Sequence, residues 1–430
     1  MKKKLLSLLL ILMMTVTAAG CGETQKSSDS SSSEPSATEE GTEAKPETTD
    51  RSDEESTDTA DDFHIGIVTG SISQSEDDRR GAEAFQQKYG EDRVTLAIYP
   101  DNFAEELDTT VQTIVNLAED PDMKAIIVNQ AVDGTTEAFR QIKKNRPDIL
   151  CIAGEVYEDF SEISPVSDLV VCSDFVARGY LLIRAAHELG CDTFVHISFP
   201  RHMSYETVVR RVNIMKAACK EFGIKFKTET APDPTTDAGV PGAQSFIRKA
   251  VPKWVKKYGQ KSAYFCTNDA HTEPLISGLL ECGGYFIEAD LPSPLLGYPG
   301  ALDLDLTRET GDFGKILAKV EDAIVEKGGA GRFGTWAYSC GYALSAGLAE
   351  HAVNVIIGKS KLDDINDLAG DFGVFSPGAE WNGSRYTDAG TGEKIDNTFL
   401  VYQDTYILGD PGYYTGSTKV KVPEKYFKIK

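Results

Sequence analysis

Three short strings match patterns found at catalytic or phosphate-binding sites. Residues 303–307, Asp-Leu-Asp-Leu-Thr, fit the DxDxT string of phosphohydrolases, in which one aspartate attacks phosphorus and the other protonates the leaving oxygen. Residues 329–334 fit the GxGxxG string of dinucleotide sites, and residues 356–360 are similar to the end of a phosphate-binding loop. The local structure that leads into each string therefore decides whether it can act.

The surrounding sequence argues against all three interpretations. The DxDxT string follows the turn-forming residues 297–300 instead of a buried strand, and a helical stretch, 313–327, precedes the GxGxxG string. Val353 stands where a phosphate loop needs its first glycine, so Gly358 fits a helix C-cap better. The six histidines form no HExxH pair. We therefore predict a protein that is not an enzyme and uses no cofactor or metal, and we keep a Mg²⁺-dependent DxDxT phosphohydrolase as an alternative.

The elements that position these residues alternate regularly along the chain. From residue 64 onward, apolar runs such as 123–130 and 169–174 are separated by amphipathic stretches of helical length such as 76–89. Nearly continuous apolar strands separated by helices are typical of parallel sheets covered on both faces. The alternation continues to about residue 298, which favours an α/β fold of two doubly wound, Rossmann-like lobes in series.

Chain length and cysteine usage agree with two lobes. Residues Phe63 to Lys430 exceed the roughly 250–300 residues beyond which a single core tends to split. Besides Cys21 there are seven cysteines without a CxxC pair, and several of them lie inside apolar runs. This pattern predicts buried thiols rather than a disulfide framework or a zinc site.

The N-terminus has the form of an export signal. Three lysines precede a short apolar stretch, Leu5 to Met14, and small residues then lead to Cys21. The Ala-Ala-Gly-Cys ending resembles a bacterial lipobox, although Ala18 stands where such boxes favour leucine. The resemblance implies cleavage after Gly20 and attachment of lipid, such as palmitate, to Cys21, and hence an extracytoplasmic protein anchored to the cell membrane. An ordinary secretory signal with a chance cysteine is the alternative.

Residues 22–62 contain Ser, Thr, acidic residues, Pro and Ala but no aromatic residue and no Ile, Leu, Val or Met. Such a segment has nothing to bury against the entropy of ordering, so we expect a disordered tether. The tether carries −11 and the leader +3, so the folded part carries −15 of the net charge of −23. An acidic body argues against nucleic acid as a partner.

The predicted strands end in polar or aromatic residues. In open α/β sheets, ligands bind beyond the carboxyl ends of the strands, and two such lobes create a cleft between them. We therefore expect a small polar ligand in that cleft. The alternative is that these residues are there only because chains turn at strand ends.

Four segments resemble the type I periplasmic-binding-protein superfamily, which includes sugar- and nucleoside-binding lipoproteins and the effector domains of LacI-type repressors. These are residues 170–180, 210–223, 265–283 and 296–300, and the opening segment, 65–85, is similar to the basic-membrane-lipoprotein branch. The resemblance extends from about His64 to Ile357. It implies two lobes joined by a multi-strand hinge, with Asp269 as a ligand acceptor and Arg210 or Arg211 as a donor. Pro299 replaces the usual Asp of the last segment, which puts that contact in doubt.

The strand ends and the resemblance together give the predicted binding residues. They are Ser71, Ser73, Gln74, Asn129, Gln130, Glu155, Asp174, Phe199, Arg201, Arg211, Asn268, Asp269 and Tyr298. Of the histidines, only His202 and His271 are expected near the cleft.

The predicted organisation follows from these elements. We expect a signal peptide over 1–20 and a lipidated tether over 21–62. We place 63–173 and 298–335 in the N-terminal lobe, 174–297 and 336–370 in the C-terminal lobe, and 371–430 in a β-rich C-terminal extension. The function that the resemblance implies is capture of a nucleoside, sugar or amino-acid-like molecule by a monomer that serves the membrane permease of an ABC importer. A ligand-sensing subunit of a membrane receptor is the first alternative.

Overall fold

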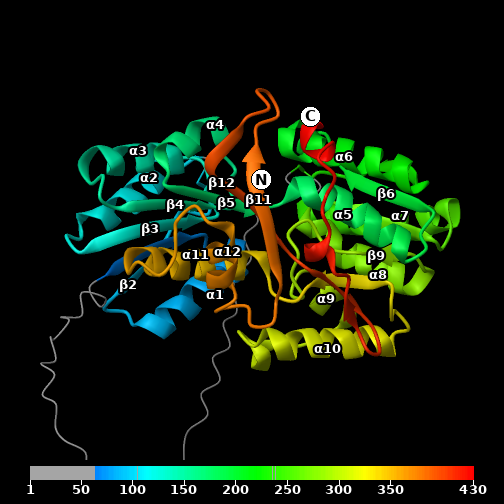
Figure 1. Ribbon diagram of the computed structural model, residues 1–430. Coiled ribbons are helices and arrows are strands. Elements are labelled where there is room, and N and C mark those ends of the chain that lie inside the picture. Colours follow the sequence, from blue (N-terminus) through cyan, green and yellow to red (C-terminus); the bar gives the residue numbers. More distant parts are fainter. Residues whose placement is uncertain (1–62, 104, 235, 238) are drawn as a thin grey trace, which may run out of the picture. The chain divides into compact units, whose positions relative to one another are not determined.

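The computed structural model describes residues 63–103, 105–234, 236–237 and 239–430, apart from the side chains of residues 73–75 (Figure 1). All of them belong to one compact unit. The predicted leader, the lipidated Cys21 and the tether lie outside the described residues. Within the described part, none of the helices has the length and apolar character needed to span a bilayer.

Two seven-stranded sheets form the centres of two lobes. Their strand orders are β11-β12-β5-β4-β3-β1-β2 and β14-β13-β10-β9-β8-β6-β7. In each sheet the first five strands along the chain are mutually parallel, and the strand order reverses beside the first of them. This arrangement confirms the predicted pair of doubly wound α/β lobes.

The strand bounds are as follows: β1 His64–Thr69, β2 Val94–Ile98, β3 Met123–Asn129, β4 Leu150–Gly154, β5 Leu169–Ser173, β6 Thr193–Ser198, β7 Lys225–Thr230, β8 Ser262–Cys266, β9 Tyr285–Phe286, β10 Phe333–Trp336, β11 Trp381–Thr387, β12 Lys394–Gln403, β13 Thr405–Leu408 and β14 Tyr413–Tyr414. The helices are α1 Ile72–Tyr89, α2 Leu107–Val115, α3 Thr135–Asn145, α4 Phe160–Ile163, α5 Phe175–Glu188, α6 Glu206–Phe222, α7 Gly239–Tyr258, α8 Thr272–Cys282, α9 Tyr298–Leu302, α10 Phe313–Glu326, α11 Cys340–Ile356 and α12 Ile365–Phe372, with short 3₁₀ turns including η2 Asn116–Glu119, η5 Asp269–His271 and η6 Thr307–Glu309.

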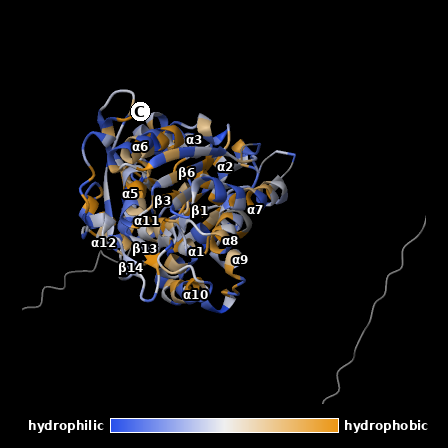
Figure 2. Cartoon of the chain, turned by 90° about the vertical axis from the view of Figure 1, so that its right-hand side faces the viewer, coloured by the Kyte–Doolittle hydropathy of each residue, from blue (hydrophilic) through white to orange (hydrophobic). Residues whose placement is uncertain are grey.

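Helices cover both faces of the first sheet. Helices α1 and α11 pack against each other on one face, and α2 and α3 pair on the other (Figure 1). In α10 the buried residues Phe313, Ile316, Val320 and Ile324 recur at helical spacing. Figure 2 accordingly shows both polar and apolar residues along α10. The helical conformation of such an amphipathic stretch places its apolar residues on one face, and that face packs into the hydrophobic core.

The chain crosses between the lobes three times among the described residues, at 173–174, 337–339 and 403–404. The second and third crossings are tied together, because the Gln403 amide donates to the Tyr338 carbonyl at 3.0 Å and accepts from the Tyr338 amide at 3.2 Å. At the first crossing, the Asp174 amide donates to the Val401 carbonyl at 2.8 Å. The hinge is therefore multi-stranded, as the resemblance implies.

The lobe boundaries expected after residue 297 are wrong. Strand β10 belongs to the second sheet, whereas α11 packs on α1 and β3 of the first lobe. Residues 298–335 thus belong to the second lobe, and 340–372 to the first. The cause is the Leu296-Gly-Tyr-Pro-Gly turn, which leads into α9 packed on α8 instead of crossing over.

The C-terminal segment contributes strands to both sheets. Strand β12 pairs in parallel with β5, and β13 pairs antiparallel with β10. The end of the chain is fastened to α6, because the buried Arg210 donates to the carbonyls of Thr387, Phe427 and Ile429, each at 2.9 Å. The predicted β-rich extension is thus an integral part of both lobes.

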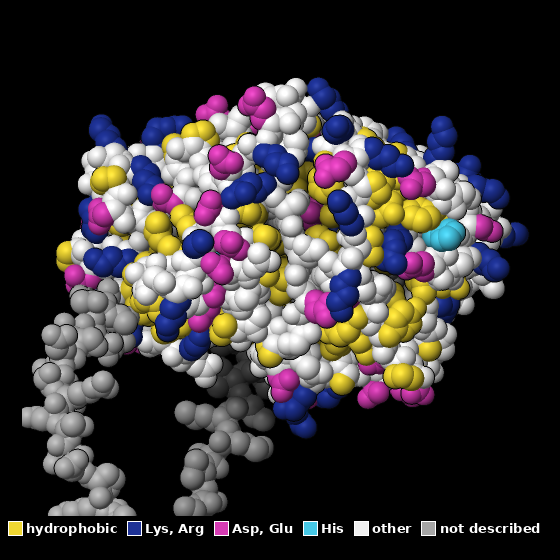
Figure 3. All heavy atoms as spheres, in the orientation of Figure 1, with side chains coloured by type: hydrophobic (Ala, Val, Ile, Leu, Met, Phe, Trp, Pro, Cys, Tyr) yellow, Lys and Arg dark blue, Asp and Glu magenta, His cyan; other side chains and the backbone are white. Residues whose placement is uncertain are grey.

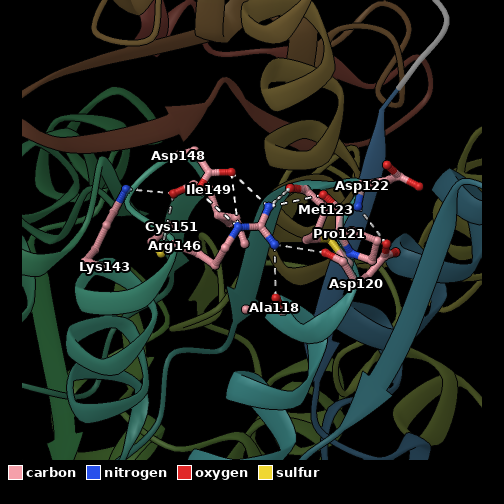
Figure 4. A network of polar contacts seen from close by, with 10 residues as sticks. All are labelled: Ala118, Asp120, Pro121, Asp122, Met123, Lys143, Arg146, Asp148, Ile149 and Cys151. Atoms are coloured by element: carbon pink, nitrogen blue, oxygen red, sulfur yellow. Dashed lines mark hydrogen bonds and ion pairs between the residues drawn. The ribbon is translucent and has the colours of Figure 1, made fainter.

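A polar network closes the outer edge of the first lobe (Figure 4). The Arg146 guanidinium donates to the backbone carbonyls of Ala118, Asp120 and Met123 at 3.1–3.2 Å, and to Asp148 at 2.8 Å. One cation thereby joins the end of α3 to η2 and to the start of β3. The seven cysteines from Cys151 onward are free in the described residues, as predicted.

Candidate functional site

A cavity of about 570 Å³ lies where the two lobes face each other. The first lobe contributes residues of α1, of α11 and of the loops after β3 and β4, and the second lobe contributes the loop after β8 and the segment between β9 and α10. Cavities of this size hold small molecules, and in doubly wound sheets they form at the carboxyl ends of the strands. The polar residues that line it are Glu76, Asp77, Asp78, Arg80, Gln130, Glu155, Asp269, Ser293, Thr307, Thr310 and Ser339.

Asp78 lies on α1 at the floor of the cavity and is only 4% exposed. Its carboxylate accepts a hydrogen bond from the Asn129 amide at 2.8 Å. Burial, and then the neighbouring carboxylates Asp77 and Glu155, raise the pKa of Asp78 to about 8. A Cβ at Gly341 would lie 2.7 Å from the Asp78 carboxylate, so glycine at the start of α11 leaves room for it. Near neutral pH these surroundings therefore favour the protonated form of Asp78.

Asp77 connects the two lobes across the cavity. It accepts a hydrogen bond at 2.9 Å from the hydroxyl of Ser293, which belongs to the second lobe. Burial raises the pKa of Asp77, and the hydroxyls of Ser339 and Ser293 offset part of that rise. A lobe movement that opens the cavity would have to break this contact.

Glu155 follows β4 with a left-handed backbone, φ 40°. A residue other than glycine pays about 1–3 kcal/mol for such a conformation, which persists only where its surroundings impose it. Here the Ser173 amide and hydroxyl donate to the Glu155 carboxylate at 2.8 and 2.9 Å. Burial raises the pKa of Glu155, although Ser173 and the Arg178 guanidinium oppose the rise.

Asp269 opens η5, directly after β8 of the second lobe, and its exposed carboxylate faces the cavity. Loss of water around the carboxylate, and then the negative charges of Asp290 and Asp77, raise the pKa of Asp269 to about 7. Burial also opposes ionisation of Asp290, but the guanidinium groups of Arg211 and Arg178 outweigh it, so the pKa of Asp290 is lowered. Asp290 therefore keeps a negative charge behind Asp269.

The remaining wall of the cavity is apolar. It consists of Leu291, Leu295, Leu296, Pro299, Leu306, Phe313, Ile316 and Leu344. Cys340 also lines the cavity, and burial followed by the charge of Glu155 raises the pKa of its thiol well above the usual range. A neutral buried thiol is a poor nucleophile, so the arrangement is suited to binding more than to covalent chemistry.

Of the predicted binding residues, Gln130, Glu155 and Asp269 line the cavity. Asn129 lies one layer below, where its amide donates to Asp78 and to the Ser345 hydroxyl, both at 2.8 Å. The side chains of Ser73 and Gln74 are not among the described residues. Ser71 precedes α1, and its hydroxyl donates to Asp101 at 2.6 Å.

Four predicted residues have structural roles instead. Asp174 caps α5 by accepting hydrogen bonds from the amides of Val176 and Ala177, and Asn268 caps η5. Tyr298 is 1% exposed and donates to the Gly334 carbonyl at 2.6 Å. Phe199 is equally buried, packed against two histidine rings. These corrections share one cause: residues at strand ends also begin helices and fill the space between layers.

The predicted arginines are paired with protein carboxylates. Arg201 forms a two-point ion pair with Asp233 at 2.7 and 3.0 Å, and Arg211 is paired with Asp290. Neither lines the cavity, and Arg210 holds the end of the chain. His202 and His271, expected near the cleft, contact Thr267 and the Pro232 carbonyl outside it.

The DxDxT string does not present two free carboxylates to a reacting group. Asp303 ends α9 with a left-handed φ of 62°, and Asp305 accepts hydrogen bonds from the amide and hydroxyl of Thr307 at 3.0 and 2.6 Å. Of this string, Leu306 and Thr307 line the cavity, and neither aspartate does. The string therefore forms a helix end and a turn.

The sequence pattern did not predict that Asp77 and Asp78 line the cavity. They lie in the charged run Glu76 to Arg80, which has the composition of a solvated helix face. Their place is set by the short Thr69-Gly-Ser71 link, which directs the first turns of α1 over the carboxyl end of β1. A helix that starts so soon after a central strand is the signal that could have found them.

A family model described as "Protein of unknown function (DUF3798)" matches residues 63–334, which is more than half of the chain. The chain belongs to this family. A further family model matches residues 345–429. Two relatives of the DUF3798 chain are described as uncharacterized proteins of Treponema pallidum (strain Nichols). One is 43% identical over 209 residues, 49% of this chain and 94% of the relative; the other is 37% identical over 180 residues, 40% and 81%.

The solved structures extend the likeness to the fold. A crystal structure from Clostridium difficile 630, described as a candidate transcriptional regulator, has a TM-score of 0.71 at 22% identity and covers 80% of this chain and 99% of that one. This shows that the DUF3798 chain has the two-lobe fold expected from the resemblance. A carbohydrate transporter from Acidothermus cellulolyticus 11B in complex with myo-inositol has a TM-score of 0.43 at 13% identity, covering 70% and 88%, which is too low to bear on the ligand.

Proposed function

We propose that this chain is an extracytoplasmic solute-binding lipoprotein that captures a small polar molecule between its lobes. One observation carries the proposal, namely a cavity lined by polar groups of both lobes. A ligand that contacts both walls binds the closed arrangement better than the open one, and so shifts the equilibrium between them. The direct Asp77–Ser293 contact is consistent with a closed arrangement.

The proposed binding role is tested by a thermal-shift screen of the purified full-length chain in detergent. The panel contains sugars, nucleosides, amino acids and amines. A ligand at 100 times its Kd adds about 2.7 kcal/mol to the free energy of unfolding. The matched variant Leu296→Trp places bulk in the cavity and should abolish the shift. A screen without a saturable shift, or a shift that survives in Leu296→Trp, would contradict the proposal.

We further propose export, lipid attachment at Cys21 and delivery of the ligand to the permease of an ABC importer. Support for export and lipidation comes from the leader and the lipobox-like Ala-Ala-Gly-Cys ending. Labelling of cells with palmitate tests the anchor: the wild-type chain should carry label, whereas Cys21→Ala should lose it and leave the membrane fraction. The permease is tested by co-purification with the ligand-loaded chain.

A further inference from the structure

The charges that line the cavity are unbalanced. Among the described residues, five carboxylates line it, and Arg80 supplies the single guanidinium. That guanidinium is already engaged, since Arg80 donates to Glu83 at 2.8 Å and lies 3.5 Å from Glu76. The lining carboxylates are Glu76, Asp77, Asp78, Glu155 and Asp269.

The carboxylates converge from separate elements of both lobes. Asp77 and Asp78 come from α1, Glu155 from the loop after β4, and Asp269 from the loop after β8. Asp269 has no hydrogen-bond or ion-pair partner among the described residues, although Asp290 and Asp77 lie close enough to raise its pKa. Gathering like charges in a partly desolvated space is costly, so their convergence indicates that a positive charge from outside completes the site.

The opposite wall favours a molecule with an apolar part. The segment from Leu291 to Pro299 and the start of α10 provide leucine, proline and phenylalanine side chains. Near the carboxylates, but outside the residues that line the cavity, lies Tyr157, which is 59% exposed. Its pKa is raised by partial removal of the hydroxyl from water and then by Glu155 and Asp269. An exposed tyrosine ring beside carboxylates can bind a cation through its face.

We propose that the ligand of this cavity is an organic cation, a protonated amine or guanidine carried on an apolar stem. This inference rests on the proposed binding function and specifies its ligand class. The nitrogen group would lie among Asp77, Asp78, Glu155 and Asp269, and the stem against the leucines of the second lobe. Ammonium and guanidinium groups supply only donors, which matches the carboxylate of Asp269, an acceptor without a hydrogen-bond or ion-pair partner among the described residues.

A metal ion and a neutral sugar fit the same walls less well. Among the described residues, the one group with three ligand atoms close enough for a metal is His64, Asp120 and Asp122, and none of these lines the cavity. A volume of about 570 Å³ also suits a molecule rather than a bare ion. A neutral polyol would leave the clustered carboxylates without a counter-charge.

The charges that line the cavity are arranged differently from those on the surface in view. On the face shown in Figure 3, acidic and basic side chains are interspersed over the surface. Interspersed charges neutralise one another at short range, whereas a cleft lined by one sign concentrates ions of the opposite sign. The walls of the cavity therefore attract cations more strongly than the interspersed charges of this face do.

Calorimetric titration of the full-length chain at pH 8 with matched probes tests the inference. Putrescine, agmatine and spermidine are the cations; 1,4-butanediol is the neutral counterpart of putrescine, and myo-inositol, uridine and glutamate complete the panel. We expect at least one cation to bind at least tenfold more tightly than every neutral or anionic probe. Saturable binding of a neutral probe without binding of a cation would overturn the inference and leave the proposed function intact. Absence of all binding would overturn both.

Variants locate the cation. Asp269→Asn should weaken binding of the best cation at least tenfold, Asp269→Glu should restore most of it, and the exposed Glu326→Gln on α10 should change nothing.

Affinity should rise about tenfold from pH 6 to pH 8 as the cavity loses protons. The charged groups that face Asp78 and Asp269 are Asp77, Glu155, Asp290 and, through them, Arg178 and Arg211. Unchanged affinity in Asp269→Asn together with a flat pH profile would contradict the cationic site.

Discussion

Carboxylates gather both at the outer edge of the first lobe, around Arg146, and in the cavity between the lobes. At the edge, Asp148 pairs with Arg146, and Arg146 also lowers the pKa of Asp148. In the cavity, Asp78 and Asp269 lie near other carboxylates, and their pKa values rise to about 8 and about 7. The first arrangement is electrostatically complete without a ligand, and the second is not.

The difference separates charges that hold the fold from charges that await a partner. A matched ion pair at the surface adds a little stability and is indifferent to ligands. Unmatched carboxylates in a cavity cost stability, and that cost is recovered when a counter-charge binds. Substitutions in the two regions should therefore have opposite signs.

The largest effect is expected for Arg178→Met. Arg178 and Glu288 form a buried ion pair at 2.8 Å, each 2% exposed, and the guanidinium also opposes the rise that burial causes in the pKa of Glu155. Loss of one partner leaves a buried charge, so the free energy of unfolding should fall by about 3–5 kcal/mol in a urea titration. The control is Arg184→Met, whose pair with Glu188 is partly exposed and which should change little. Equal effects in the two variants would remove the distinction between buried and surface charge.

Asp78→Asn should stabilise the empty protein. The folded pKa of Asp78 is about 8, and an unfolded aspartate ionises near 4, so its contribution to stability is fully present below pH 4 and is lost as the pH rises to 8. Asparagine does not ionise, so the variant should match the wild type at pH 4 and exceed it at pH 8 by more than the about 1.4 kcal/mol that corresponds to one pKa unit. Urea titrations across this range provide the measurement. A variant that is less stable at pH 8 would show that Asp78 serves the fold.

Arg146→Met should act in the opposite direction at the edge of the lobe. It removes the donor for the carbonyls of Ala118, Asp120 and Met123, which water can partly replace because the site lies at the surface. We expect the melting temperature to fall by about 2 °C, with no change in ligand binding. A loss of ligand affinity would show that the edge and the cavity are coupled.

The smallest effect is expected for Asp148→Asn. Its exposed pair with Arg146 is screened by solvent, so the melting temperature should stay within about 1 °C of the wild type. Added salt should erase even that difference. A larger shift at low salt would mean that the network of Figure 4 acts as one cooperative unit.

Much of the fold can be predicted from the alternation of apolar runs and helical stretches. The prediction is reliable there because each buried strand, such as β3, needs apolar residues on both faces, and that requirement is local. The crossings are different. The turn at Gly297 leads into α9, where Gly297 packs closely against Thr272. A Cβ atom at position 297 would lie 2.7 Å from the methyl group of Thr272. No local pattern encodes such a contact.

The candidate site was predictable only where a strand end coincides with the cavity, as at Gln130, Glu155 and Asp269. Tyr298 fails because an aromatic residue near a turn is equally suited to filling the core, and its hydroxyl finds a backbone carbonyl there. Asp77 and Asp78 could not be predicted, because their position in the cavity depends on how helix α1 packs over the sheet, and the charged sequence of α1 does not encode that packing.

The order in which the chain passes through the two lobes determines how the gene encodes them. Because the polypeptide passes from first to second, back to first and again to second, neither lobe is encoded by one contiguous stretch. No single stop codon or gene fusion can therefore deliver one half alone. A recombination event that exchanges ligand specificity must transfer several separated segments together.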